Sequence, residues 1–168
     1  MEEPRWLTPA EREAWLTLSR LIVRLPAALD TQLQRDAGLS YFEYMVLAIL
    51  SEQPGYAMRM SRLAYLVNGS LSRLSHVVKR LEKQGWVRRE PDARYTNAIL
   101  TPSGRDKVVA SAPGHVRTVR ELVLDPLGCA GIRDLHELGQ RVVQAVDPCT
   151  GVPEGPLRQH GPEAGTTA

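Results

Sequence analysis

One short hairpin pattern in an otherwise helical sequence restricts the fold more than any other feature. Residues 86–90 and 96–100 predict two strands joined by a turn over 91–95. Because an isolated two-stranded hairpin is at best marginally stable in water, it must pack against neighbouring helices. The hairpin directly follows a helix predicted over 70–84, which Gly85 ends. This order predicts a helix-turn-helix followed by a two-stranded wing.

Further helices are predicted on both sides of this unit. A capping box at Thr8 opens a helix over about 8–36 with a kink at Pro26, and a second box at Ser40 opens a helix that stops before Pro54. A brief extended piece at 56–58 and a short helix over about 60–67 follow. After the wing, a helix restarts at 101–102, is expected to bend or break near Ala112, and ends at 125–126. The last predicted helix covers about 132–146.

The charge is concentrated in the middle of the chain. Residues 59–105 hold ten Lys or Arg and three acids, a net charge of +7, which leaves −5 elsewhere to give the overall +2. A basic block in a near-neutral chain indicates a polyanionic partner, and a solvated charged face is the alternative. The acidic N-terminus lacks a signal-peptide pattern and no apolar run is long enough to span a membrane, so we expect a cytoplasmic protein. Cys129 and Cys149 lack disulfide-framework or metal spacing.

The helix over 70–84 divides into two faces. Leu71, Leu74, Val77, Val78 and Leu81 form a core-facing stripe, and Ser72, His76, Lys79 and Lys83 lie opposite, flanked by Arg73 and Arg80. Short hydroxyls, a forked guanidinium and further cations suit a helix inserted into a DNA major groove, and an ordinary basic surface helix is the alternative. For His76, a groove contact, a metal ligand and a plain surface residue all stay open, although no ligand partner lies at suitable spacing.

The hairpin has its own candidate contacts. Val87, Ala98 and Leu100 are predicted to face inward, and Arg88, Arg89 and Arg94 outward. Arg94 lies at the tip, where an arginine can enter a minor groove. Asp92 can bond turn amides or pair with Arg94. A surface turn with incidental charges is the alternative.

Several motifs in this region together resemble the MarR family of bacterial winged-helix transcription regulators. They are Leu63-Ala64, Ser70, Val77 to Lys83, Gly85 to Arg89, Asp92-Ala93-Arg94 and Leu100 to Gly104. The resemblance implies a homodimer that binds a pseudo-palindromic operator in double-stranded DNA, with 70–84 as recognition helix, Arg94 as wing-tip arginine and Asp92 as its support. Arg59 stands where a capping Ser or Thr is usual, so Ser61 becomes a candidate phosphate contact instead. Trp86 replaces the usual leucine.

The candidate DNA contacts are Ser61, Ser70, Ser72, Arg73, Ser75, His76, Lys79, Arg80, Asp92 and Arg94. Apolar residues outside the basic block independently favour a dimer, because one small winged domain does not need them all. They are Trp6, Leu7, Trp15, Leu122, Val123, Leu124, Leu127, Leu135, Leu138, Val142 and Val143. A monomer with a self-contained helical layer is the alternative.

The predicted fold class is mainly α with a small β-wing. It comprises a single MarR-like domain over 8–146, with a winged lobe at 39–104 and dimerisation helices at 8–36 and 105–146. The Pro- and Gly-rich stretch 147–168 predicts a disordered tail. Nucleophile, phosphate-loop and metal motifs are lacking, so we expect neither an enzyme nor a bound cofactor. The preferred function is a DNA-binding repressor. The alternatives are a winged-helix protein-interaction module and a regulator that responds to redox state or to a small-molecule effector, which the family often binds between the dimer helices and the winged domain.

Overall fold

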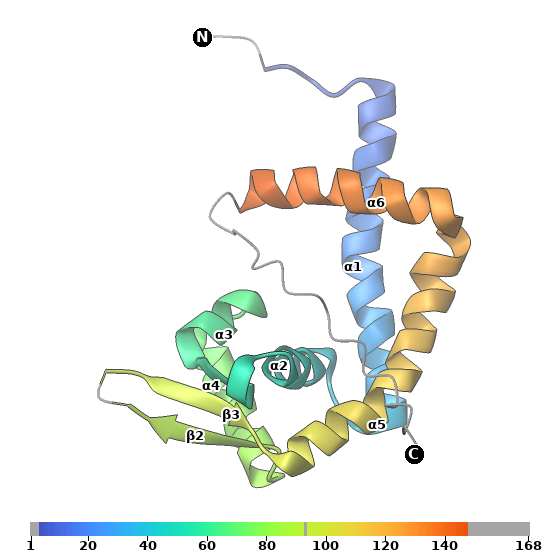
Figure 1. Ribbon diagram of the computed structural model, residues 1–168. Coiled ribbons are helices and arrows are strands. Elements are labelled where there is room, and N and C mark those ends of the chain that lie inside the picture. Colours follow the sequence, from blue (N-terminus) through green and yellow to red (C-terminus); the bar gives the residue numbers. More distant parts are fainter. Residues whose placement is uncertain (1–3, 93, 148–168) are drawn as a thin grey trace, which may run out of the picture.

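The computed structural model describes residues 4–92 and 94–147. Six α-helices in this part of the chain are α1 (Pro9–Ala37), α2 (Tyr41–Ser51), α3 (Met60–Leu66), α4 (Leu71–Lys83), α5 (Pro102–Val119) and α6 (Asp125–Val146). The strands are β1 (Ala57–Arg59), β2 (Val87–Pro91) and β3 (Thr96–Leu100), with a 3-10 turn at Pro54–Tyr56 and a π-helical turn at Arg120–Leu124. The predicted fold class, mainly helical with a small β-wing, is confirmed (Figure 1).

The capping signals read from the sequence lie where the helices begin. Thr8 and Glu11 form a reciprocal capping box at α1, and Ser40 and Glu43 form a second one at α2. Each box satisfies backbone N–H groups that a helix N-terminus leaves without partners. Gly38 ends α1 with a positive φ of 63°, a backbone conformation that glycine adopts at little cost.

The hydrophobic core lies between α2, α3, α4 and the sheet. Its fully buried side chains include Leu47, Leu50, Leu63, Leu74 and Val78. The sheet is antiparallel in the order β1-β3-β2, so the wing strands gain a third strand from the extended piece before α3. Val87 pairs with Leu100 in this sheet, and both are buried, as predicted. Packing against the helices therefore supplies the stability that an isolated hairpin lacks.

The C-terminal helices differ in part from the prediction. Near Ala112 a bend or a break was expected, and α5 passes through Pro113 without a break and ends at Val119, although its two halves run in different directions (Figure 1). Proline removes one backbone hydrogen bond, and packing of α5 against α1 and α2 holds the helix together there. The last helix begins at Asp125 rather than near 132, with a non-helical backbone at Gly128 (φ 61°), so Cys129 lies in α6 and not in a preceding loop.

The N-terminal half of α1 projects away from the winged lobe, whereas α6 crosses α1 and runs back above α3 (Figure 1). The hydroxyl of Tyr65, at the end of α3, donates to the carboxylate of Asp147 directly after α6. The buried residues of α1 are confined to its C-terminal half, at Leu29, Gln32 and Leu33, and α6 has none. The predicted tail lies outside the described residues apart from Asp147. Across the described part of the chain, the helices are all too short or too polar to cross a membrane.

Candidate nucleic-acid interface

Helix α4 is fixed by its apolar face. Leu74, Val77, Val78 and Leu81 are buried against the core, whereas Leu71 in the first turn is 53% exposed, so its predicted core position was wrong. Ser70 directly precedes the helix, and its Oγ accepts the Arg73 N–H at 3.1 Å. Ser70 therefore has a structural role as an N-cap, in addition to any contact that it makes from the surface.

The opposite face of α4 presents the residues predicted from the sequence. Exposed side chains on this helix include Ser72, Arg73, His76, Lys79 and Arg80, with Ser75 half-buried. Ser61 is also exposed, in the first turn of α3. The structure thus brings the predicted helix residues to one surface, while the contacts that they would make stay predictions.

Arg80 is held by an acid on another helix. Its Nε lies 2.6 Å from Oε1 of Glu43 in α2, and the Glu43 side chain is only 10% exposed. Oε2 of Glu43 accepts the backbone N–H and the hydroxyl of Ser40 at 2.8 and 2.7 Å. Burial raises the pKa of Glu43, but the bonds from Ser40 and Arg80 outweigh it, so the net shift is downward. Arg80 therefore fastens α4 to α2, a role that the sequence analysis missed.

Arg73 also contacts α2. Its guanidinium carbon lies 4.2 Å from the centre of the Phe42 ring, a distance at which a cation is attracted to an aromatic face. A stacked guanidinium keeps its N–H donors at its edges. Arg73 is thus oriented by Phe42 while it remains exposed on the outer side of α4.

Two arginines of strand β2 pair with acids of the same lobe. Arg89 is exposed, as predicted, although it lies on the sheet face of Val87, and it pairs with Glu82 of α4 at 2.7 Å. Arg88 lies on the outer face and pairs with Glu90. Glu82 and Glu90 are two of the three acids in the basic block. Their pairing leaves the cations of the α4 surface and the wing tip uncompensated by these two acids.

Arg94 is exposed at the wing tip, between strands β2 and β3. The backbone N–H of Asp92 donates to the carbonyl of Tyr95 at 2.7 Å, which closes the turn around Arg94. Arg59, at the end of β1, provides no side-chain cap to α3, as predicted. It stacks instead on the ring of Tyr95, with its guanidinium carbon 3.7 Å from the ring centre. Neither Arg59 nor Tyr95 was among the predicted site residues.

The root of the wing is bonded to the start of α5. The hydroxyls of Thr101 and Ser103 both donate to the carbonyl of Gly85, at 2.6 and 2.8 Å. Gly104 packs so closely that an added Cβ would lie 2.0 Å from the carbonyl oxygen of Trp86. The pattern of threonine and glycine after β3 is therefore explained by hydrogen bonding and by a close backbone approach.

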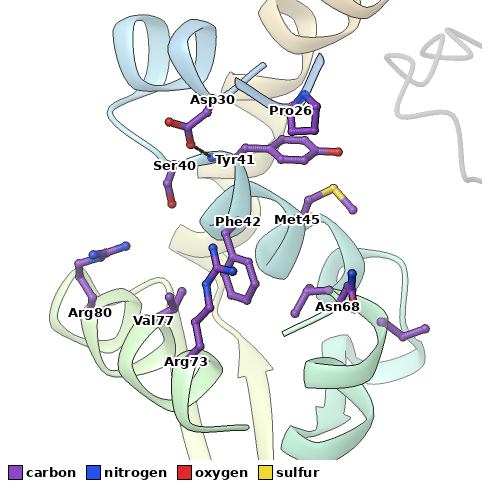
Figure 2. A pocket seen from close by; sticks show the side chains of 12 residues that line it. Pro26, Asp30, Ser40, Tyr41, Phe42, Met45, Asn68, Arg73, Val77 and Arg80 are labelled. Carbon is purple, nitrogen blue, oxygen red and sulfur yellow. Dashed lines mark hydrogen bonds between the residues drawn. The ribbon is translucent and has the colours of Figure 1, made fainter. Parts of the chain in front are cut away.

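A groove of about 680 Å³ lies beside this surface, between α1, α2 and the α3–α4 pair (Figure 2). Tyr41, Phe42 and Met45 of α2 provide apolar and aromatic lining, and α4 contributes Arg73, which reaches across to Phe42, and Arg80. Asp30 accepts the backbone N–H of Tyr41 at 2.7 Å and so joins α1 to α2.

Two features of the described residues bear on metal binding and redox chemistry. No group of three or more His, Cys, Asp or Glu is placed to hold a metal ion in this part of the chain. Cys129 is a free, exposed thiol on α6. Cys149 lies outside the described residues.

Comparison with known proteins gives consistent matches. The model of the MarR family matches residues 39–94. The fold is similar to that of Sco3205 from Streptomyces coelicolor, a MarR family transcriptional regulator solved in complex with DNA, with 42% identity, a TM-score of 0.82, and coverage of 89% of this chain and 95% of that one. It is also similar to AbsC of the same organism, another MarR family regulator, with 36% identity, a TM-score of 0.80, and coverage of 86% and 99%. The transcriptional regulator PecS of Dickeya dadantii (strain 3937) is 32% identical over 111 residues, which cover 64% of this chain and 66% of PecS.

Proposed function

Because the chain belongs to the MarR family of transcriptional regulators, we propose that it is a homodimeric repressor that binds a pseudo-palindromic operator in double-stranded DNA. Residues 39–104 form the DNA-binding lobe, with α4 in the major groove and Arg94 in the minor groove. Residues 8–36 and 105–146 form the dimerisation helices.

The observation that carries the proposal is the composition of one surface. A hydroxyl, an imidazole and two cations on α4 (Ser72, His76, Arg73 and Lys79) are exposed on a helix whose other side is buried. Hydroxyls and guanidinium groups suit base edges, and cations suit phosphates. A protein-interaction module is less well supported, because the core of a protein interface is depleted in charged residues.

The dimer is supported by apolar side chains that the single chain leaves exposed. Of the predicted set, Trp6, Leu7, Trp15, Leu122, Leu127, Leu135, Leu138, Val142 and Val143 are exposed. They lie on α6, on α1 and in the segments flanking these helices. So many large apolar side chains exposed on two helices favour burial against a partner. A two-fold axis between two copies would present two copies of α4, and so require an operator with two similar half-sites.

Binding is tested with duplexes from the region upstream of the protein's own gene, using fluorescence anisotropy over a series of salt concentrations. We expect affinity to fall steeply with salt, because each neutralised phosphate releases counterions. Arg94→Ala and Lys79→Ala should weaken binding, whereas Arg35→Gln, an equal charge change at an exposed position on α1, should leave it nearly unchanged. Binding that ignores salt, or equal losses in all three variants, would contradict the proposal. Run-off transcription from a promoter that overlaps the bound site tests repression, which requires the transcript to decrease as protein is added.

The groove supports a second function, response to a small-molecule effector. Its aromatic wall and the two arginines of α4 suit a molecule with an apolar body and an anionic group (Figure 2). Since Arg73 and Arg80 belong to α4, an anion bound there would compete with DNA for the same helix. Benzoate is a suitable probe. It should raise the unfolding temperature of the wild type more than that of Arg73→Ala, and equal shifts in both proteins would contradict the site.

A further inference from the structure

Both the backbone and the side chain of Tyr95 are restrained by neighbouring residues. Its carbonyl accepts the Asp92 N–H at 2.7 Å, and its ring lies under the guanidinium of Arg59, 3.7 Å from guanidinium carbon to ring centre. Arg94 lies between Asp92 and Tyr95 in sequence, inside the turn that this backbone bond closes. The tip of the wing is therefore joined to the body of the lobe through the residue next to Arg94.

The sheet register explains how Arg59 reaches the wing tip. Arg59 is paired with Asn97 across β1 and β3. Tyr95 lies two residues before Asn97 and so on the same side of the ribbon, at the diagonal position that long and aromatic side chains can span. Met58 and Ala98, the next pair, face the other way, and Ala98 is fully buried. The contact between Arg59 and Tyr95 is thus built on the outer face of the sheet by strand pairing.

An exposed hairpin tip without such a contact has few restraints beyond its backbone hydrogen bonds. The ring of Tyr95 is half-buried although it lies beyond the last ladder pair of β3, while Arg94 beside it is exposed. The Arg59 side chain makes no cap bond to α3, because a guanidinium has no hydrogen-bond acceptor, and it contacts the Tyr95 ring. Pre-organisation of a side chain lowers the entropy lost on binding.

We propose that Arg59 and Tyr95 are positioning residues for the wing, which together fix the direction and depth at which Arg94 enters the minor groove. The inference rests on the proposed DNA-binding function. It assigns part of the sequence preference of the protein, at the operator flanks, to an arginine–tyrosine stack that does not itself contact the bases.

The test uses the full-length protein and three duplexes that differ only at the flanking base pairs under the wings. The flanks are A·T, G·C or inosine·C, because inosine lacks the minor-groove amino group of guanine while it keeps a guanine-like major-groove edge. Four proteins are compared, namely the wild type, Tyr95→Leu, Tyr95→Phe and Arg59→Gln. Tyr95→Leu alters no charge, and Tyr95→Phe keeps the ring.

We expect the wild type and Tyr95→Phe to prefer A·T and inosine·C flanks over G·C flanks. Tyr95→Leu and Arg59→Gln should lose this preference while they retain selectivity at the central, major-groove positions. The affinity of Tyr95→Leu for A·T flanks should fall about 3- to 10-fold, the range expected for an exposed cation–aromatic contact and its ordering effect. Its salt dependence should match that of the wild type, because no cation is removed.

Four other outcomes are informative, because each would either refute the positioning role, decide it through the second variant, or reject the proposed function. If Tyr95→Leu keeps the flank preference, the stack does not position Arg94. If Tyr95→Phe behaves like Tyr95→Leu, the hydroxyl and not the ring is responsible, which also overturns the proposal. If Tyr95→Leu does not fold, as judged by circular dichroism, the comparison of Arg59→Gln with the wild type decides, and an unchanged flank preference there refutes the pair. Failure of the wild type to bind any duplex would instead reject the proposed function itself.

Discussion

The ion pair between Arg80 and Glu43 gives the sharpest prediction, because two roles for Arg80 have opposite consequences. The sequence predicted Arg80 as a DNA contact, whereas the structure bonds it to an acid of α2 at 2.6 Å. If the pair is mainly structural, Arg80→Ala leaves the carboxylate of Glu43, 10% exposed, without its cation. The Ser40 donors remain, so the loss should be that of one charge-assisted hydrogen bond rather than of an entirely unpaired buried charge.

The magnitude follows from this geometry. A hydrogen bond to a charged group contributes about 1.5–3 kcal/mol. The Arg80 side chain is 58% exposed, and solvent screens exposed partners, so we expect the low end, about 1.5 kcal/mol. In a protein of this size a loss of that kind lowers the unfolding temperature by about 3–6 °C. The free energy of unfolding is measured with urea for the wild type, Arg80→Ala, Glu43→Gln and the double variant. All four are held at one protein concentration, because dimerisation makes apparent stability concentration-dependent.

We expect the double variant to be no less stable than the more damaged single variant, which corresponds to a coupling energy of about 1 kcal/mol or more between contacting residues. Operator affinity is measured on the same proteins at conditions where all are folded. The reasoning is refuted if the two losses of stability add and Arg80→Ala lowers operator affinity equally in the wild-type protein and in the Glu43→Gln background. That result would make Arg80 a DNA contact, as the sequence predicted.

Three further predictions concern other parts of the molecule. Because the pKa of Glu43 is lowered, its ionised carboxylate contributes stability above the ordinary carboxyl pKa of about 4.5, and this contribution is lost as the pH falls through the folded-state value. Below pH 4.5, the free energy of unfolding measured with urea should therefore decrease less for Glu43→Gln than for the wild type. Gly104→Ala should destabilise by on the order of 3 kcal/mol, because its Cβ would meet the backbone carbonyl of Trp86; calorimetry that shows a shift within error of the wild type would remove the close-packing explanation. Leu138→Glu, at a side chain 58% exposed on α6, should convert a dimer to a monomer in sedimentation velocity while circular dichroism stays unchanged, and an undisturbed dimer would place the interface elsewhere.

The sequence predicted those features that have local signals. Capping boxes at Thr8 and Ser40, the glycine after α1 and the alternation in β3 each involve neighbouring residues, and the elements begin or end where these signals lie. The outward face of α4 followed from helical spacing alone. For Arg89, the two-residue period of a strand already places the residue on the sheet face of Val87.

The contacts that were missed join distant parts of the chain. Arg80 and Glu43 are 37 positions apart, and the pairing of Arg59 with Tyr95 depends on a register between β1 and β3 that no turn sequence fixes. At Pro113 the chain bends but remains helical, because packing of α5 on α1 and α2 favours the helix over a break. Propensity is a weak guide when tertiary contacts on both sides of a residue favour the helix.

Thr101 is the one residue between the end of β3 and the beginning of α5. It caps α5 through the Gly104 N–H at 3.0 Å and donates to Gly85 at the start of the wing. Because the junction is one residue long, a displacement of the wing on DNA would move α5 directly rather than be absorbed by a flexible linker. In a dimer on one operator, each wing would act in this way on its own C-terminal helices. The helical phase between the half-sites would then affect the conformational strain in the complex.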